Sequence, residues 1–455
     1  MSAPLPVLED LPQKPAYLPL EIQQDFFELF QKIEHHHENC FLLESLGDET
    51  YDSRHAVIGF DPRHIVAGEA ERLLVDGQPV PTDNPYYSLR QLFPRDVISR
   101  LYAGGLVGYM GYDASNYMEG ALDLAWHSDF PAFQLGLYLD GLILDKMTGQ
   151  VFYFHYGEDR SAEILRIAAE EAPTIAQPVV QFEGFSRSRA EHRTMVEAAR
   201  EEIVAGNTFQ CQIGFKARYS ISGSKLPIYE CLRRINPSPH MFYVKFGQRV
   251  IIGASPELIF RLRQGELESF PLAGTIHRGA SQAEDRELAR RLLNDPKEIA
   301  EHNMLVDLHR NDLGRVARFG TVKVRRIFDI KRFSHVQHIS SEVVGIIHRD
   351  HDMFSGLAGS FPAGTLSGAP KIESMKIIDR LEQDARGPYG GAVGHFGLNG
   401  DCTFAIPIRS LFCNGENAFN QASGGIVYDS VVENEYTEIL NKLAGMARAL
   451  QEFEE

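Results

Sequence analysis

Short strand-like runs fill the first 160 residues of this chain, and they constrain its fold more than any other feature. Apolar and aromatic residues cluster at 41–43, 57–59, 106–112, 133–138 and 150–155, between stretches rich in glycine and polar residues. Runs of this length and composition predict β-strands. Helical spacing is rare here and is clearest at 21–34. We therefore expect residues 1–160 to form a sheet-rich segment of an α+β protein.

The sequence changes character after residue 188. Apolar residues have helical spacing at 189–204, 227–234, 285–294 and 296–306, with strand-like runs between them at 208–210, 241–246 and 250–252. A polar stretch at 158–178, with one predicted helix, connects the two parts. The chain of 455 residues is long enough for two domains or one large one. We divide it into a first half, 1–160, and a second half, 185–455.

Charge and cysteine usage exclude several classes of protein. The formal net charge is -17, which argues against a basic surface for nucleic acid. The five cysteines are scattered and form no Cys-x-x-Cys pair, so we expect neither a disulfide framework nor a zinc site, and a cytoplasmic location is favoured. No signal pattern and no apolar run of about 20 residues is present, so no membrane span is expected.

Two pairs of glutamates have the spacing of one helix face. Glu435 and Glu438 follow a Gln-Ala-Ser-Gly-Gly motif that predicts a turn, with Ser430 as the candidate N-cap of their helix. Glu298 and Glu301 show the same spacing in the helix predicted at 296–306. One such pair more often marks a solvated helix face with ion pairs. Two of them could form an oxygen site for Mg²⁺.

Nine ordered motifs resemble those of the chorismate-utilising enzymes. They are ASPE (254–257), PLAGT (271–275), KEIAEH, LVDLHRNDLGRV, HVQHISSEV, PAGTLSGAPK, GPYGGAVG, QASGGIV and ENEYTEILNK. The resemblance covers 191–450 and continues into the first half through LLES (42–45), IGFDP (58–62) and GGLVGYMGYD (104–113). It implies an α+β fold made of a large two-sheet sandwich of mostly antiparallel strands, with helices on the outside.

The resemblance also implies a role for each motif residue. Mg²⁺ would be held by Glu301 and Glu438, with Glu298 and Glu435 close by, and would bind the ring carboxylate of chorismate. The catalytic set implied by the motifs comprises Glu257 as the acid for the departing 4-hydroxyl, His338 as an aid to the loss of pyruvate, Gln210 and Thr275. The implied substrate contacts are Thr365, Tyr389 and Arg409, together with Ser423, Gly424, Gly425 and Lys442.

Two positions select the branch of the family. Branches that add water to chorismate carry a lysine base where this chain has Gln210, which cannot deprotonate water. The branch that makes 4-amino-4-deoxychorismate carries a nucleophilic lysine where this chain has Ala273. The branch that remains makes anthranilate and pyruvate from chorismate and ammonia, for tryptophan biosynthesis. The alternatives are the aminodeoxychorismate branch and a catalytically silent paralogue that only binds ligands.

The resemblance implies two further ligands besides chorismate. No cysteine has the setting of a glutamine-hydrolysing nucleophile, so a separate glutamine amidotransferase subunit would supply ammonia in a hetero-oligomer. The first half would carry a feedback site for tryptophan. The residues that match this site are Glu44, Ser45, Arg54, Pro239, His240 and Met241.

Three departures from the family motifs stand out. Ser423 replaces a glycine that is usual in the substrate motif, and His240 replaces a tyrosine in the feedback motif. The stretch QIGFKARY (212–219) differs from the usual VLSQRF-like sequence. The first departure affects how the backbone meets the substrate, and the second affects inhibition by tryptophan.

Overall fold

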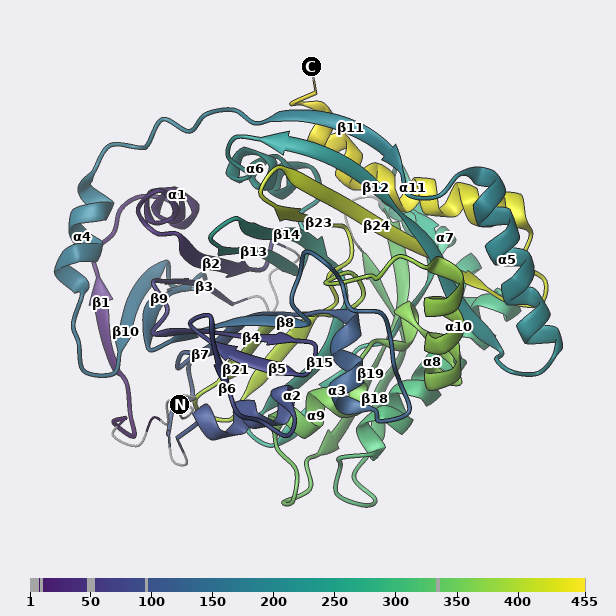
Figure 1. Cartoon of the computed structure of the whole chain (residues 1–455), viewed down its shortest axis with the longest axis horizontal. Helices are drawn as coiled ribbons and strands as arrows, with labels where there is room; N and C mark the ends of the chain where they lie inside the picture. Colours follow the sequence, from purple (N-terminus) through teal and green to yellow (C-terminus); the bar gives the residue numbers. More distant parts are fainter. Residues whose placement is uncertain (1–7, 9–10, 47–53, 95–96, 333–335, 455) are drawn as a thin grey trace.

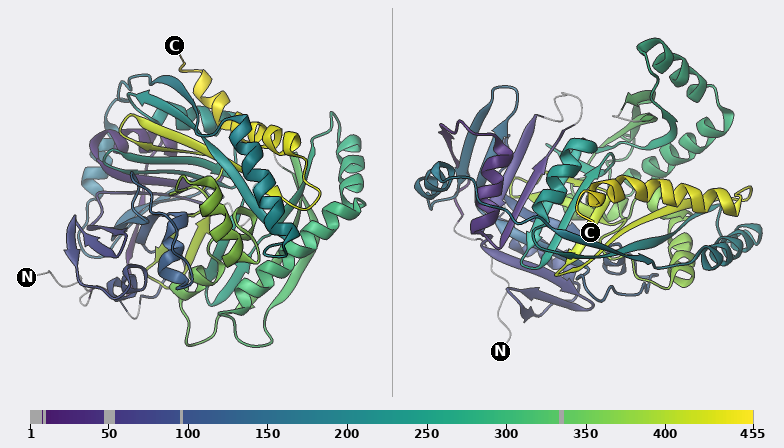
Figure 2. Two further views of the ribbon diagram at one scale, coloured as in Figure 1. Left: turned by 45° about the vertical axis from the view of Figure 1, so that its right-hand side comes forward. Right: turned by 90° about the horizontal axis from the view of Figure 1, so that it is seen from above.

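Two antiparallel sheets, each with twelve strands among the described residues, pack against each other (Figures 1 and 2). The structure is a computed structural model that describes residues 8, 11–46, 54–94, 97–332 and 336–454. The strand order of the first sheet is β1 (Ala16–Leu20), β10 (Gln150–His155), β9 (Asp140–Asp145), β3 (His55–Phe60), β2 (Asn39–Glu44), β13 (His240–Phe246), β14 (Arg249–Ser255), β23 (Ser410–Asn414), β24 (Asn417–Ile426), β12 (Gln210–Ser222) and β11 (Val179–Phe185), with β20 (Gly368–Ala369) beside β12.

The second sheet begins with strands from the second half of the chain and ends with strands from the first. Its order is β17 (Leu272–His277), β19 (Val336–Ile346), β16 (Glu266–Ser269), β15 (Leu258–Arg263), β22 (Cys402–Ala405), β21 (Ala392–Gly397), β7 (Gly105–Met110), β8 (Phe133–Tyr138), β4 (His64–Glu69), β5 (Arg72–Val75) and β6 (Gln78–Val80), with β18 (Lys323–Arg332) beside β19. The predicted α+β fold of two antiparallel sheets is therefore confirmed.

Helices cover the outer faces of the sandwich, as the sequence predicts. Those in the described residues are α1 (Phe26–His36), α2 (Pro85–Ser88), α3 (Ser115–Met118), α4 (Ser161–Ala169), α5 (Arg189–Val204), α6 (Leu226–Ile235), α7 (Gln282–Leu293), α8 (Pro296–Gly314), α9 (Met353–Ser360), α10 (Lys371–Glu382) and α11 (Val432–Gln451), with short 3₁₀ turns η2 (Leu89–Leu92), η3 (Tyr112–Ala114) and η4 (Gly364–Leu366). No helix within these ranges is long and apolar enough to cross a membrane.

The main hydrophobic core lies between the two sheets. It joins aromatic side chains of the first sheet, such as Phe242 and Phe412, to those of the second, such as Phe133 and Phe404. A second core fills the space between the first sheet and α1, α6 and α11, which lie along its outer side (Figure 1). Burial of this much apolar surface holds the sheets at a fixed separation, so loops at their edges are positioned by a rigid frame.

Both halves of the sequence contribute strands to both sheets. In the first sheet β2 pairs with β13, and in the second β7 pairs with β21. Strand β14 of the first sheet leads directly through Pro256 and Glu257 into β15 of the second sheet. The predicted hairpin partners at 41–43 and 57–59 do pair, as β2 and β3.

Several predicted boundaries are wrong by a few residues. Asp25 caps α1 by accepting a hydrogen bond from the Phe27 backbone, so this helix begins later than predicted. Helix α8 continues past 306 to Gly314. Ser430 is not an N-cap, because Val431 holds that position and the Ser430 hydroxyl accepts a hydrogen bond from the Val427 N–H.

Candidate functional site

The carboxyl of Glu257 lies buried where the chain passes from one sheet to the other. The hydroxyl of Thr365, in η4, donates a hydrogen bond to its Oε1 over 3.0 Å. Burial raises the pKa of Glu257 to about 7, and this effect outweighs the Thr365 hydrogen bond and the nearby charges of Arg409 and Lys442, which lower it. A carboxyl with this pKa can hold a proton near neutral pH and release it to a leaving group.

His338 lies on β19 opposite Thr275 of the neighbouring strand β17. Its Nδ1 is 2.9 Å from the carbonyl oxygen of Gly274 and 3.1 Å from the hydroxyl of Thr275. Burial lowers the pKa of His338 to about 4, and the charge of Arg409 contributes in the same direction. The imidazole is therefore neutral at physiological pH. Its Nδ1 carries the proton, because a carbonyl oxygen can only accept.

Arg409 brings a buried positive charge to the same region. It precedes β23, and its backbone has a φ of 52°, a left-handed conformation that is uncommon for a non-glycine residue. No carboxylate within salt-bridge distance of its guanidinium is found in the described part of the chain. Burial lowers the pKa of Arg409, and the charge of Glu257 opposes that effect. A guanidinium in this setting is well suited to bind an anionic substrate group.

The Ser-Gly-Gly motif is part of a strand, not of the predicted turn. Ser423, Gly424 and Gly425 lie in β24 and pair with β12. At both glycines a side chain would approach the end of a neighbouring side chain, which would have to shift. A β-carbon on Gly424 would lie 3.0 Å from Oε2 of Glu435, and one on Gly425 would lie 2.6 Å from Nε2 of Gln210.

Lys442 of α11 fixes this strand from the helix side. Its ammonium donates a hydrogen bond to the carbonyl oxygen of Ser423 over 2.7 Å and pairs with Glu438 over 2.7 Å. The side chain is about half exposed. Its charge is therefore accessible from solvent, and an anionic group could reach it.

The four glutamates predicted to bind a metal come from α8 and α11, and the charge of Glu438 on α11 acts on Glu298 of α8. Burial raises the pKa of Glu298, and the charges of Glu301 and Glu438 raise it further. The pKa of Glu435 is also raised by burial and by Glu438. Like charges held this close favour binding of a cation.

These carboxylates are not arranged as a ready ligand cluster. Within the described ranges, no group of three or more histidine, cysteine, aspartate or glutamate side chains has the geometry to hold a metal. Lysines pair with two of the four: Lys297 lies 3.7 Å from Glu301, and Lys442 lies 2.7 Å from Glu438. A cation would have to replace these ammonium groups. The all-oxygen donor set fits Mg²⁺, and the roles of these residues stay a prediction.

Two residues predicted for the feedback site, Glu44 and Arg54, pair with groups outside that set. Glu44 accepts hydrogen bonds from Tyr229 at 2.9 Å and from Nε of Arg233 at 2.6 Å. Arg54 pairs with Asp145, and its hydrogen bond lowers the pKa of the Asp145 carboxyl to about 2. Met241 lies opposite Glu44, since β2 pairs with β13, while Ser45 follows Glu44 in the chain and Pro239 and His240 precede Met241. The feedback role stays a prediction.

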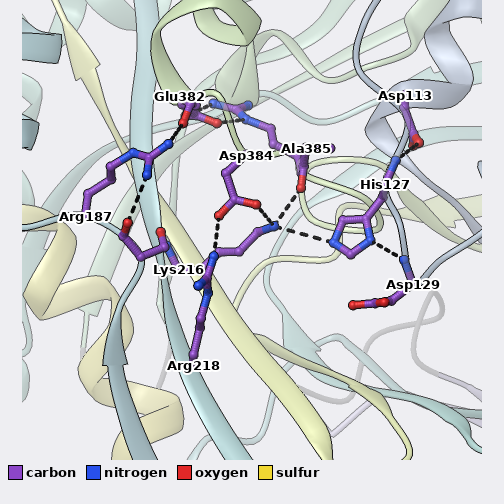
Figure 3. Close-up of polar contacts among 11 residues, drawn as sticks. Asp113, His127, Asp129, Arg187, Lys216, Arg218, Glu382, Asp384 and Ala385 are labelled. Atoms are coloured by element: carbon purple, nitrogen blue, oxygen red, sulfur yellow. Dashed lines mark hydrogen bonds and ion pairs between the residues drawn. The ribbon is translucent and has the colours of Figure 1, made fainter.

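The sequence analysis missed the charged groups that hold the loop carrying Tyr389. Arg386 is buried and pairs with Glu382 over 2.7 Å, while its guanidinium also donates to the carbonyl oxygens of Leu366 and Gln212. Figure 3 shows Glu382 beside Arg187. The Arg386 guanidinium lies 4.7 Å from the ring centre of Tyr112 and 5.6 Å from that of Tyr389.

A second missed group lies next to this loop. The buried Lys216 donates to Asp384 and to the carbonyl oxygen of Ala385, each over 2.7 Å, and lies 3.5 Å from Nε2 of His127 (Figure 3). The only sequence signal was that Lys216 lies in the QIGFKARY stretch, which departs from the family motif. These contacts tie the segment 382–389 to β12, so the position of Tyr389 follows that of the sheet.

Known proteins resemble this chain in sequence and in fold. The chain matches the family model of chorismate binding enzymes over residues 23–448. It is 58% identical to anthranilate synthase component 1 of Leptospira biflexa, and the match covers 99% of each chain. It is 42% identical to anthranilate synthase component 1 of Methanothermobacter thermautotrophicus, over 93% of this chain and 92% of the relative.

Solved structures have the same fold. Anthranilate synthase component I from Streptococcus pneumoniae superposes with a TM-score of 0.79 at 31% identity, covering 88% of this chain and 93% of the other. The menaquinone-specific isochorismate synthase of Escherichia coli superposes with a TM-score of 0.74 at 18% identity, over 97% of this chain and 96% of the other. The second likeness bears on the fold alone.

Proposed function

Because the chain belongs to the family of chorismate binding enzymes, we propose that it is the large subunit of an anthranilate synthase. It would convert chorismate and ammonia to anthranilate and pyruvate, the first committed step of tryptophan biosynthesis. One observation carries this proposal: a buried carboxyl, Glu257, has a pKa of about 7 beside Arg409, a buried cation whose side chain can take a substrate carboxylate. An acid and an anion clamp in one pocket suit removal of a hydroxyl from an anionic substrate.

Each residue then has one task in the reaction. Arg409 binds the enolpyruvyl carboxylate, and Lys442 with the backbone of β24 binds the ring carboxylate. Glu257 gives its proton to the departing 4-hydroxyl while ammonia adds at C2. His338, neutral with its proton on Nδ1, accepts a proton at Nε2 as pyruvate leaves and the ring becomes aromatic. Mg²⁺ held by Glu298, Glu301, Glu435 and Glu438 would withdraw electrons from the ring through its carboxylate.

Two side chains argue against the other reactions of the family. Gln210 lies beside Gly425, at the ring-carboxylate end of the pocket, and its amide cannot act as a base toward water. Ala273 lies on β17 opposite Ile339, where a methyl group offers no amine for covalent attack. The aminodeoxychorismate synthase reaction is therefore the weaker candidate, and a silent paralogue would not be expected to retain Glu257, His338 and Arg409 together.

The proposal extends to the partners of the chain. A glutamine amidotransferase subunit would supply ammonia, and tryptophan would inhibit through the site around Glu44 and Ser45. The reaction uses small soluble metabolites, so we place the enzyme in the cytoplasm. These assignments rest on the family and on the motifs named above.

The decisive experiment is an assay of the isolated chain. Purified protein is incubated with chorismate, Mg²⁺ and an ammonium salt at alkaline pH, and anthranilate is followed by its fluorescence, with pyruvate measured in parallel. Equal amounts of the two products support the proposal. A product that only a separate lyase converts to para-aminobenzoate would instead identify an aminodeoxychorismate synthase, and no turnover of chorismate would indicate a silent paralogue.

A further inference from the structure

Two of the departures from the family motifs contact each other. Ser423 replaces the usual glycine on β24, and Gln212 stands at the first position of the stretch that departs from the VLSQRF-like sequence of β12. The hydroxyl of Ser423 donates to Oε1 of Gln212 over 3.1 Å. The same hydroxyl oxygen lies 2.9 Å from the hydroxyl of Tyr389. The two unusual residues thus form one hydrogen-bonded series that ends at Tyr389, which the family resemblance assigns to the substrate contacts.

The direction of donation along these hydrogen bonds is fixed, because a serine hydroxyl carries a single proton. That proton is given to the amide oxygen of Gln212, which can only accept. The Ser423 oxygen must therefore accept the proton of Tyr389. With its only proton used in this way, the hydroxyl of Tyr389 offers lone pairs to the pocket and no donor. Arg409 is then left to bind the substrate carboxylate without help from Tyr389.

The three side chains are well placed to keep this order. Gln212, Ser423 and Tyr389 are 8%, 3% and 2% exposed, so water does not compete for their hydrogen bonds. The backbone carbonyl of Gln212 accepts from Arg386 over 2.9 Å, and its N–H donates to Ser367 over 3.0 Å. A polar group left without its partner in such a site is costly, so the chain favours one arrangement.

We propose that Gln212 is a positioning residue, which acts through Ser423 to hold the Tyr389 hydroxyl as a hydrogen-bond acceptor facing the substrate. The pair replaces an apolar residue and a glycine of the usual motifs, and each member requires the other. The inference rests on the proposed function, since the substrate that Tyr389 faces is taken to be chorismate.

The test is a double-mutant cycle on the full chain. The variants are Gln212→Met, Ser423→Gly and both together, measured for kcat and for KM toward chorismate with an ammonium salt. Gln212→Met removes the amide but keeps the length of the side chain. The freed Ser423 proton can then go to Tyr389, whose own proton becomes available to a substrate carboxylate, so we expect KM to fall about fivefold to tenfold and kcat to stay within about twofold. Without the Ser423 hydroxyl, no hydrogen bonds link Gln212 to Tyr389. The double variant should therefore have the same KM as Ser423→Gly alone.

A second set of variants tests Tyr389, the last residue of the hydrogen-bonded series. In Tyr389→Phe the hydroxyl is missing, and Gln212→Met should then change KM by less than about twofold. Gln134→Met is the matched control, because Gln134 is a buried glutamine on β8 of the other sheet. Its KM should equal that of the wild type.

Three outcomes would overturn the proposal. They are an unchanged KM in Gln212→Met, effects of Gln212→Met and Ser423→Gly that multiply in the double variant, or an equal effect of Gln212→Met in the Tyr389→Phe background. The last two would indicate a merely structural role.

The wild-type assay separates failure of this inference from failure of the proposed function. If the wild type makes no anthranilate, the proposed function itself is contradicted. Urea unfolding of the four proteins of the cycle gives the Gln212–Ser423 coupling independently of substrate, and additive midpoints would also contradict the pairing.

Discussion

At the scale of single residues, burial decides which groups carry protons. Glu257 lies where water is excluded, and its charged form is stabilised only by the hydroxyl of Thr365 and by two more distant cations. The protonated form therefore persists to about pH 7, whereas the same carboxyl in an unfolded chain would lose its proton near 4.5. Below about pH 7 Glu257 can act as an acid, and above it the proton is lost.

We predict that Glu257→Gln lowers kcat/KM by about 10²–10⁴-fold, because an amide cannot donate a proton to the 4-hydroxyl. The supply of free ammonia rises with pH, so kcat/KM is divided by the concentration of free ammonia. In the wild type this corrected value should fall about tenfold per pH unit above about pH 7, as Glu257 loses its proton. Thr365→Val removes the hydrogen bond to the anion, which raises the pKa further and moves this fall to higher pH. Initial rates across a pH series check both points. The same descending limb in Glu257→Gln would show that another group titrates.

The residues of the site were largely predictable from the sequence, and their partners were not. Glu257, His338 and Arg409 stand in motifs whose order is readable along the chain. The contact of Gln212 with Ser423 depends on the pairing of β12 with β24, which joins residues far apart in sequence. No local pattern marks such a contact, so Gln212 remained unassigned until the strands were placed.

At the scale of elements, α8 and α11 bring four glutamates close enough for their charges to act on one another. Each contributes two of these glutamates and one lysine, and the lysines pair with Glu301 and Glu438. The helical spacing of these residues is a strong local signal, and both helices were predicted from it. The Gln-Ala-Ser-Gly-Gly part of β24 is predicted as a turn, because glycines are typical of turns; in the structure Gly424 and Gly425 leave room for Glu435 and Gln210.

We predict that Mg²⁺ stabilises the wild-type protein and that Glu438→Gln abolishes this effect together with turnover. At a concentration 100 times its dissociation constant, a ligand stabilises the folded state by about 2.7 kcal/mol. Thermal unfolding with and without Mg²⁺ measures the effect without any assay of activity. Glu433→Gln is the matched control, since Glu433 lies on the same helix but pairs with Arg193 at the surface. A Mg²⁺-dependent rise in the Tm of Glu438→Gln would contradict the assigned ligand.

At the scale of the whole molecule, the fold buries several histidines in neutral form. Burial lowers their pKa values to about 4 or below, and the set comprises His127, His192, His302, His309, His338 and His395. An unfolded histidine takes up a proton near pH 6.5, but these take it up only near pH 4 while the protein is folded. Below pH 6.5 the unfolded state binds more protons, so stability falls as the pH falls toward 4.

His192 offers the cleanest test of this acid sensitivity. It packs between the rings of Phe215 and Tyr436, and its ring nitrogens have no hydrogen-bond partner among the described residues. The wild type loses stability between about pH 7 and pH 5. We predict that this loss, measured as the free energy of unfolding, is smaller by about 1–2 kcal/mol in His192→Phe. Urea unfolding at both pH values measures it. Replacing the exposed His35 should leave the loss unchanged, and an equal loss in His192→Phe would show that His192 does not contribute.

The pairing of strands across the two halves was the least predictable part of the fold. Single strands such as β8 and β10 match their predicted ranges, because alternation and glycine boundaries are local. The neighbours of each strand are set by contacts between distant segments, for which one sequence contains no periodic signal. The division at residues 160–185 follows a real change of composition, yet each sheet contains strands from both sides of it.

Strand β13 lies between a strand of the first half, β2, and the strand that leads to Glu257, β14. On one side Met241 faces Glu44 of β2, and on the other it faces Ala254 of β14. One residue along, Ser255 accepts a hydrogen bond from the backbone N–H of Glu257. Glu44 and the backbone of Glu257 are therefore joined through the hydrogen-bonded strands β2, β13 and β14, and no flexible loop intervenes between Glu44 and Ser255.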